Sequence, residues 1–157
     1  PAPVVAAVHG HALGGGAGLV ATVDIAVAQT DTMFGFTEVR IGLIPATISP
    51  YVIDRIGTTA ARRYLLTAEL FDAAEAQRIG LISAVADDAA AEAERLVETL
   101  LTVGPNAVRI TKQLVRERPS NEELARLISE VRASAEGQAG LQAFLAREDP
   151  PWRSARS

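Results

Sequence analysis

The sequence has no cysteine, few aromatic residues and no long hydrophobic run. Without cysteine there can be no disulfides, thiolate nucleophiles or cysteine-ligated metal sites, and such a chain suits a reducing compartment, so we expect a cytoplasmic location. Because aromatic residues make up only 4%, we expect a core of mainly Ala, Val, Leu and Ile. The longest apolar stretch, residues 12–23, contains several glycines and is too short to cross a bilayer, so we expect no membrane association.

Positive charge is also too scattered for a nucleic-acid-binding face. The net charge is -4, Lys112 is the single lysine, and the arginines are spread along the chain. A nucleic-acid-binding domain needs its basic residues clustered, so nucleic acid is not an expected partner. The 157 residues fit one domain with a sizeable core.

Short apolar runs dominate the first 57 residues, and amphipathic stripes dominate the remainder. Residues 4–8, 25–28 and 33–36 are typical of short buried strands. Between the first two lie a glycine cluster and room for about two helical turns. The sequence therefore predicts a strand, a tight glycine turn, a short helix and two further strands.

Helix start signals recur in the second part of the chain. Asp72 with Glu75, and Ser120 with Glu123, have the spacing of capping boxes. Pro105 follows a glycine, as expected at the first turn of a helix. These signals predict a mainly helical C-terminal region.

The glycine cluster at positions 14–16 is the most informative local feature. Adjacent glycines allow positive φ angles and a close approach of a ligand to the main chain. If a helix begins there, its first N–H groups lack partners and can bind a phosphate or a developing oxyanion. The alternative is a packing turn between a strand and a helix.

Two other ligand types can be weighed at this turn. Residues 16–21 (GAGLVA), with Glu38 about twenty residues further on, match a dinucleotide-binding fingerprint. That motif needs a full crossover helix, whereas the next strand is expected to begin near residue 25, which argues against it. His9 and His11 are two residues apart, but no third ligand lies nearby in the sequence, so we expect no metal site.

Taken together, several runs resemble the crotonase (enoyl-CoA hydratase/isomerase) superfamily. They are residues 3–16 (PVVAAVHGHALGGG), 24–25 (DI), 34–45 (FGFTEVRIGLIP), 72–76 (DAAEA), 80–82 (GLI), 136–144 and 151–152. Residues 44–50 (IPATISP) look most like bacterial methylglutaconyl-CoA-type hydratases. The resemblance implies an α/β fold of the spiral ββα (ClpP/crotonase) type, with the family's N-terminal portion missing and a helical C-terminal region. We expect residues 1–86 to form the C-terminal part of the core and residues 87–157 an oligomerisation region.

The resemblance also implies roles for individual residues. Gly15 matches the position whose N–H donates to the thioester oxygen, and Glu38 matches the catalytic glutamate, which we expect to be buried among Phe36, Val39 and Ile41. The substrate-binding positions expected around them are Gly14, Gly16, Gly18 and Pro45. Coenzyme A would enter as part of the acyl-CoA thioester substrate, with no separate cofactor.

Two departures from the family pattern leave alternatives open. Gly18 stands where the best-known hydratases carry a second glutamate. The missing N-terminal portion would supply the other amide of the oxyanion hole. We therefore expect an enoyl-CoA hydratase, with a Δ3,Δ2-enoyl-CoA isomerase or an inactive acyl-CoA-binding subunit as alternatives. The family resemblance further implies a homotrimer or homohexamer.

Overall fold

The computed structural model describes residues 2–154, which fall into two compact units. One spans Val4–Leu96 and contains all the strands; the other comprises residues 97–154 together with residues 2–3. We call them the glycine-turn unit and the helical unit. The division falls within one helix, α4 (Ala89–Leu101). The functional boundary expected at residue 86 stays a prediction.

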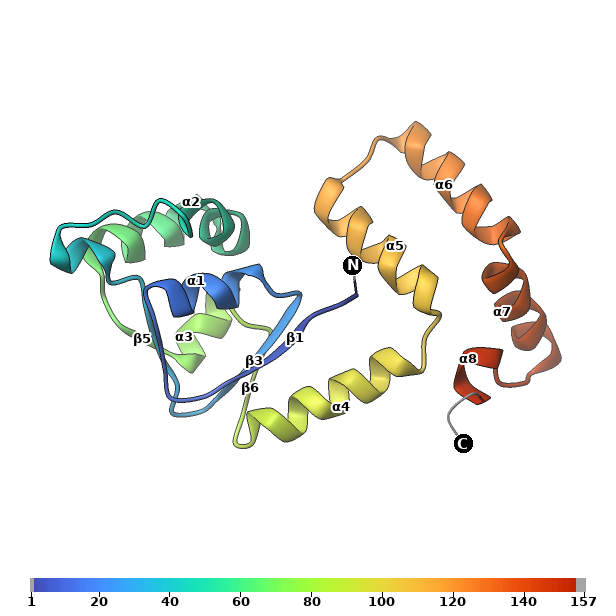
Figure 1. The fold of residues 1–157 in the computed structure, drawn as a ribbon, viewed down its shortest axis with the longest axis horizontal. Helices are drawn as coiled ribbons and strands as arrows, with labels where there is room; N and C mark the ends of the chain where they lie inside the picture. The colour runs from blue at the N-terminus through green and yellow to red at the C-terminus, as the bar shows by residue number, and fades with distance from the viewer. Residues whose placement is uncertain (1, 155–157) are drawn as a thin grey trace. The chain divides into compact units, whose positions relative to one another are not determined.

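The glycine-turn unit alternates short strands with helices (Figure 1). Its elements are β1 (Val5–Val8), β2 (His11–Leu13), α1 (Gly15–Thr22), β3 (Ile25–Gln29), β4 (Met33–Gly35), the 3-10 helix η1 (Glu38–Ile41), α2 (Ser49–Thr67), β5 (Phe71–Asp72), α3 (Ala73–Arg78) and β6 (Ala84–Ala86). One sheet has the parallel order β1-β3-β6, and the other has the order β2-β4-β5. The predicted α/β class is confirmed.

The register of the second sheet positions the glycine turn. Strands β2 and β4 are parallel, and Leu13 pairs with Gly35 at their final residues. Parallel neighbours that end in register leave the sheet at the same edge. The chain after Leu13, which is the glycine turn, and the chain after Gly35, which leads to Glu38, therefore leave the sheet side by side.

Alanines and an aromatic cluster form the core of this unit. The rings of Phe34 and Phe71 stack with their centroids 5.9 Å apart, and the ring of Tyr64 lies 4.3 Å from that of Phe71. Phe36 is also buried and packs on Phe71. The core expected from composition is confirmed, since most buried residues are Ala, Val, Leu or Ile, and the aromatic residues that are buried form a cluster within it. Large rings bury the most apolar area per residue.

Two helical features of this unit differ from the sequence-based expectations. Helix α2 is 19 residues long, but the sequence did not predict its bounds, because Gly57 interrupts it with a φ of 73°. Asp72 caps α3 as expected, accepting from the Glu75 N–H at 2.8 Å. The side chain of Glu75 does not complete the capping box, because it bonds Tyr64 and Arg78 instead.

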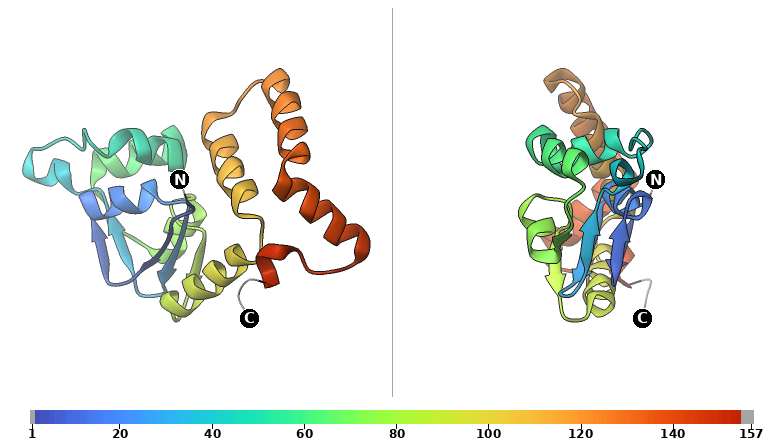
Figure 2. Two further views of the ribbon diagram at one scale, coloured as in Figure 1. Left: turned by 45° about the vertical axis from the view of Figure 1, so that its right-hand side comes forward. Right: turned by 90° about the vertical axis from the view of Figure 1, so that its left-hand side faces the viewer.

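The helical unit contains the end of α4 and four further helices, with α5 running beside an arm made of α6 and α7 (Figure 2). The bounds are α5 (Pro105–Glu117), α6 (Asn121–Ala133), α7 (Ala135–Ala146) and α8 (Pro151–Ser154). The predicted capping box at Ser120 is confirmed, since the Ser120 N–H donates to the Glu123 carboxylate at 2.8 Å. No helix within residues 2–154 combines the length and apolar character needed to cross a membrane.

Candidate active site

The glycine turn opens directly into helix α1. Gly14 has φ 51° and ψ -121°, a conformation that side-chain-bearing residues rarely adopt. Its N–H donates to the Gly35 carbonyl at 2.8 Å, which ties the turn to the end of β4. The first amide with an acceptor in the helix is that of Gly18, which donates to the Gly14 carbonyl at 3.0 Å. The preceding amides, those of Gly15, Gly16 and Ala17, have no acceptor within their own helix.

Two of these amides belong to exposed residues with free space around them. A β-carbon built on Gly15 or Gly16 would meet no heavy atom of the chain within 4 Å. Both residues are exposed at the helix N-terminus, where the helix dipole favours negative charge. An anionic oxygen of a ligand therefore has access to these amides.

The side chain of Glu38 reaches the same turn. A β-carbon on Gly14 would lie 3.4 Å from Oε1 of Glu38 and 3.7 Å from the Thr37 hydroxyl oxygen. The other carboxylate oxygen, Oε2, is buried and has no hydrogen-bond partner among the described residues. A buried oxygen without a partner is costly, so it favours a ligand that supplies a donor. Of the residues expected to surround and bury Glu38, Phe36 is indeed buried, whereas Ile41 is 74% exposed.

Long-range contacts fix the short helix that carries Glu38. The Arg40 guanidinium donates to the Ala68 carbonyl at 2.5 Å, just beyond the end of α2. The Leu43 N–H donates to the Glu38 carbonyl at 3.1 Å and closes η1. Sequence reasoning missed Arg40, because its partner is 28 residues away and no local pattern marks the pair.

Gly18 and Pro45 lie in closer contact with the rest of the chain than Gly15 and Gly16 do. A β-carbon on Gly18 would lie 2.2 Å from Cγ2 of Ile48, so Gly18 is a close packing position. The carbonyl of Pro45 accepts from the Ser49 N–H at 2.9 Å in the turn that leads into α2. Binding roles for these two residues stay predictions. Ile48 was not singled out from the sequence.

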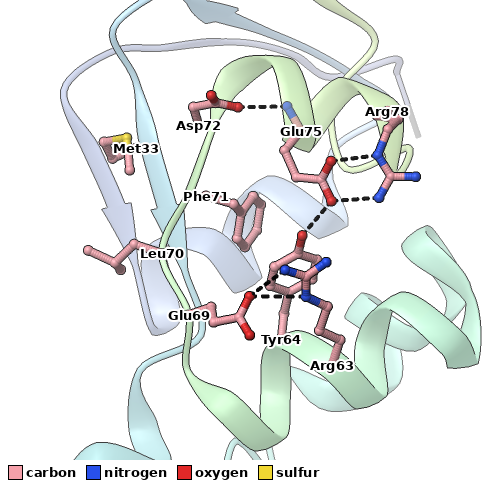
Figure 3. Close-up of a pocket in the computed structure, with 9 residues that line it drawn as sticks. All are labelled: Met33, Arg63, Tyr64, Glu69, Leu70, Phe71, Asp72, Glu75 and Arg78. Carbon is pink, nitrogen blue, oxygen red and sulfur yellow. Dashed lines mark hydrogen bonds and ion pairs between the residues drawn. The ribbon is translucent and has the colours of Figure 1, made fainter.

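A pocket of about 620 Å³ lies apart from the glycine turn, over β5 and between α2 and α3 (Figure 3). Glu75 bonds Arg78 at 2.5 Å and also accepts from the Tyr64 hydroxyl, while Arg63 pairs with Glu69 at 2.7 Å. The hydrogen bonds from Arg78 and then Tyr64 lower the pKa of Glu75 to about 2. Burial, followed by the bond to Glu75, raises the pKa of Tyr64. Both arginines are thus paired, and the network joins α2 to α3 without leaving an unpaired cation for a ligand.

The histidines do not form part of a recognisable metal site. His9 and His11 are both exposed. Among residues 2–154 there is no group of three or more His, Cys, Asp or Glu side chains that could hold a metal ion. The expected absence of a metal stays a prediction.

Comparison with known proteins gives consistent matches along the chain. The sequence profile of the Enoyl-CoA hydratase/isomerase family matches residues 1–155. A Thermus thermophilus protein assigned as an enoyl-CoA hydratase is 35% identical over 158 residues, which are 96% of this chain and 62% of that protein.

Solved structures give the same picture. A Legionella pneumophila protein assigned as an enoyl-CoA hydratase/isomerase (crotonase) is 43% identical with a TM-score of 0.89, over 96% of this chain and 61% of that one. An enoyl-CoA hydratase from Shewanella pealeana is 39% identical with a TM-score of 0.89, over 96% of this chain and 59% of that one. The chain spans about three fifths of the length of these relatives.

Proposed function

Because the chain belongs to the enoyl-CoA hydratase/isomerase family and has the crotonase fold predicted from its sequence, we propose that its protein adds water to a 2-enoyl-CoA. The observation that carries the proposal is the carboxylate of Glu38, which reaches the glycine turn at Gly14 and has one buried oxygen without a hydrogen-bond partner among the described residues. The exposed Gly15 and Gly16 follow Gly14 in the same turn. Such a pairing suits a reaction in which a proton moves while negative charge develops on a nearby oxygen. Coenzyme A takes part only as the thioester portion of the substrate.

The Gly15 amide acts on the thioester carbonyl oxygen. When water adds to the β-carbon of a 2-enoyl thioester, electrons shift towards this oxygen and an enolate forms. A donor fixed at a helix start meets this charge without reorganisation, and one such donor is typically worth about a hundredfold to a thousandfold in rate. Gly16 provides a neighbouring amide, and Gly14 holds the turn that presents both.

Glu38 acts as the acid and base. Its carboxylate takes a proton from the attacking water as the hydroxyl oxygen bonds to the β-carbon. The carboxylic acid that results gives a proton to the α-carbon as the enolate collapses. The net change is addition of H and OH across the double bond, and Glu38 returns to its starting form.

A second candidate is isomerisation of a 3-enoyl-CoA to a 2-enoyl-CoA. It is favoured by the contact between Ile48 and Gly18, which leaves no room for a second carboxylate at that point of α1. One carboxylate suffices to carry a proton from the α-carbon to the γ-carbon, whereas hydration must also position a water.

Assays on the natural gene product that contains this sequence separate these reactions. We expect loss of the enone absorbance of a 2-enoyl-CoA on hydration, and we expect Glu38→Gln to lower kcat by about a hundredfold to ten-thousandfold. Glu94→Gln, at an exposed position of α4, is the matched control and should leave kcat unchanged. Turnover of a 3-enoyl-CoA alone would favour the isomerase. Binding of acyl-CoA without turnover of either would make the protein an inactive acyl-CoA-binding subunit.

Assembly is the remaining part of the proposal. Helices α5, α6 and α7 carry apolar side chains, none of them buried. Such helices need a further surface to cover them. We expect a second and third copy to provide it, in a homotrimer or a homohexamer. The cytoplasmic location and the resemblance to methylglutaconyl-CoA-type hydratases likewise stay predictions.

A further inference from the structure

The side chain of Ile48 closes one side of helix α1. A β-carbon on Gly18 would lie 2.2 Å from Cγ2, 2.6 Å from Cβ and 3.3 Å from Cδ1 of Ile48. At Gly15 and Gly16 the corresponding positions are open. The start of the helix is therefore accessible at its first two residues and covered by an apolar side chain one turn later.

Glu38 and Ile48 contact the same helix at neighbouring turns. Glu38 reaches Gly14, Ile48 covers Gly18, and the Gly18 N–H donates to the Gly14 carbonyl at 3.0 Å. Residues joined in this way lie about one turn apart, about 6 Å along the axis. A group that extends along α1 from the carbons served by Glu38 therefore meets Ile48.

Ile48 is also held in place. Its side chain is half-buried and packs against the core of the glycine-turn unit. Its carbonyl accepts from the Val52 N–H at 3.0 Å in the first turn of α2. A side chain that packs against the core from an anchored backbone has little room to move, and differences of a methylene group in such an apolar wall change selectivity by about tenfold or more.

From this geometry we infer that Ile48 determines which acyl groups the site accepts. Its Cγ2 and Cδ1 atoms limit the size of the acyl chain next to the carbons that Glu38 serves. The inference rests on the proposed function, since it requires an acyl-CoA bound at the glycine turn. It assigns Ile48 to specificity and gives it no part in proton transfer.

The test compares Ile48→Ala with Ile48→Val in the natural gene product. Valine keeps the Cβ and Cγ2 atoms nearest to Gly18, whereas alanine removes Cγ2 and Cδ1. The substrates are but-2-enoyl-CoA, 3-methylbut-2-enoyl-CoA and hex-2-enoyl-CoA, with the matching 3-enoyl-CoAs if the wild type is an isomerase. For Ile48→Ala we expect kcat/KM for a bulkier substrate, relative to the smallest, to rise about tenfold, mainly through KM, with a smaller rise for valine.

Ratios that stay within about twofold of wild type in both variants, with turnover retained, would overturn the role of Ile48. If Ile48→Ala does not fold, Ile48→Val alone decides, since its selectivity must still move in the same direction. Gly18→Ala tests the contact itself. We expect it to lower the melting temperature, and Ile48→Ala in the same chain to restore part of the loss. Absence of turnover by the wild type on every substrate would instead reject the proposed function.

Discussion

The glycine-turn unit has a buried core, although it also exposes apolar side chains such as Ile44 and Leu66, whereas the helical unit has no buried residue among those described. Every buried apolar residue lies between Ala12 and Ala93, and no residue described beyond Ala93 is buried. Exposed apolar side chains of the helical unit include Val115, Ile128, Phe144 and Leu145. The first unit has sheets that its helices can cover, and the second is made of helices alone. The glycine-turn unit thus forms a buried core, and the helical unit forms none among its described residues.

The groove between α5 and α6 shows how apolar side chains of the helical unit stay uncovered. It has a volume of about 510 Å³ and is lined by Ala107, Ile110, Thr111, Leu114, Leu124, Ala125, Leu127, Ile128 and Val131. Almost all of these side chains are apolar, as on the core-facing stripe of an amphipathic helix. The helical unit therefore has apolar helix faces of the kind that are usually buried, but its own residues do not cover them.

The most direct test of the difference between the units is the same substitution, Phe to Ala, made once in each of them. Phe34→Ala removes a fully buried ring from the aromatic cluster, and we expect a loss of about 3–5 kcal/mol in the free energy of unfolding. Phe144→Ala removes a ring that is 81% exposed, and we expect a loss below about 0.5 kcal/mol in the protomer. Urea denaturation of both variants at low protein concentration provides the measurement. Equal losses would contradict the difference between the units.

A charge placed in the groove tests whether the helical unit is an assembly surface. We expect Ile128→Glu, at a position 64% exposed, to weaken self-association by about 2 kcal/mol or more, because a carboxylate would be buried in an apolar contact. Sedimentation over a range of protein concentrations would show the shift towards smaller species. Gln113→Glu adds the same charge at an exposed polar position of α5 and should change nothing. Unchanged association in Ile128→Glu would refute the assembly proposal for this groove.

The Glu75 network predicts a dependence on pH within the glycine-turn unit. The pKa of Glu75 is lowered from 4.5 to about 2, so the folded state favours the ionised form. The stabilisation is complete above pH 4.5 and is lost as the pH falls from there towards 2. We expect about 1–2 kcal/mol, less than the full shift implies, because Arg78 is 68% exposed and water screens the pair.

Unfolding of wild type and Glu75→Gln at a series of pH values measures this contribution. The difference between the two proteins should shrink as the pH falls through the window from 4.5 to 2. A difference that does not change over this range would mean that Glu75 is not stabilised by its partners in the folded state.

The smallest expected effect concerns a contact that holds the helical unit together. Glu136 of α7 accepts from the N–H groups of Asn106 and Ala107, at 3.0 and 2.9 Å, and so caps α5. We expect Glu136→Ala to cost about 1 kcal/mol, as for loss of an N-cap. Glu130→Ala, which removes a loose surface pair with Arg126 at 3.8 Å, should cost less than about 0.5 kcal/mol. Equal costs in thermal unfolding would argue against the cap.

Sequence reasoning proposed Gly15 and Glu38 as site residues, a role that stays a prediction, and identified only some of the side chains around them. Gly15 and Glu38 were singled out because residues 3–16 and 34–45 resemble the crotonase superfamily. The structure brings them together through the parallel pairing of Leu13 with Gly35. Strand β2 was missed, since a three-residue strand with two exposed residues carries almost no periodic signal.

The sequence by itself determined the start of α1 and the capping box at Ser120, because these depend on neighbours within a few residues. It also indicated the fold class, through a resemblance that runs along nearly the whole chain. Only the tertiary structure decided that Ile48 covers Gly18, that Arg40 bonds the Ala68 carbonyl and that Glu136 caps α5. Each of these contacts joins residues about 30 apart in the chain. Their geometry depends on how whole elements pack against one another, and the sequence pattern of one element does not identify its partner in another.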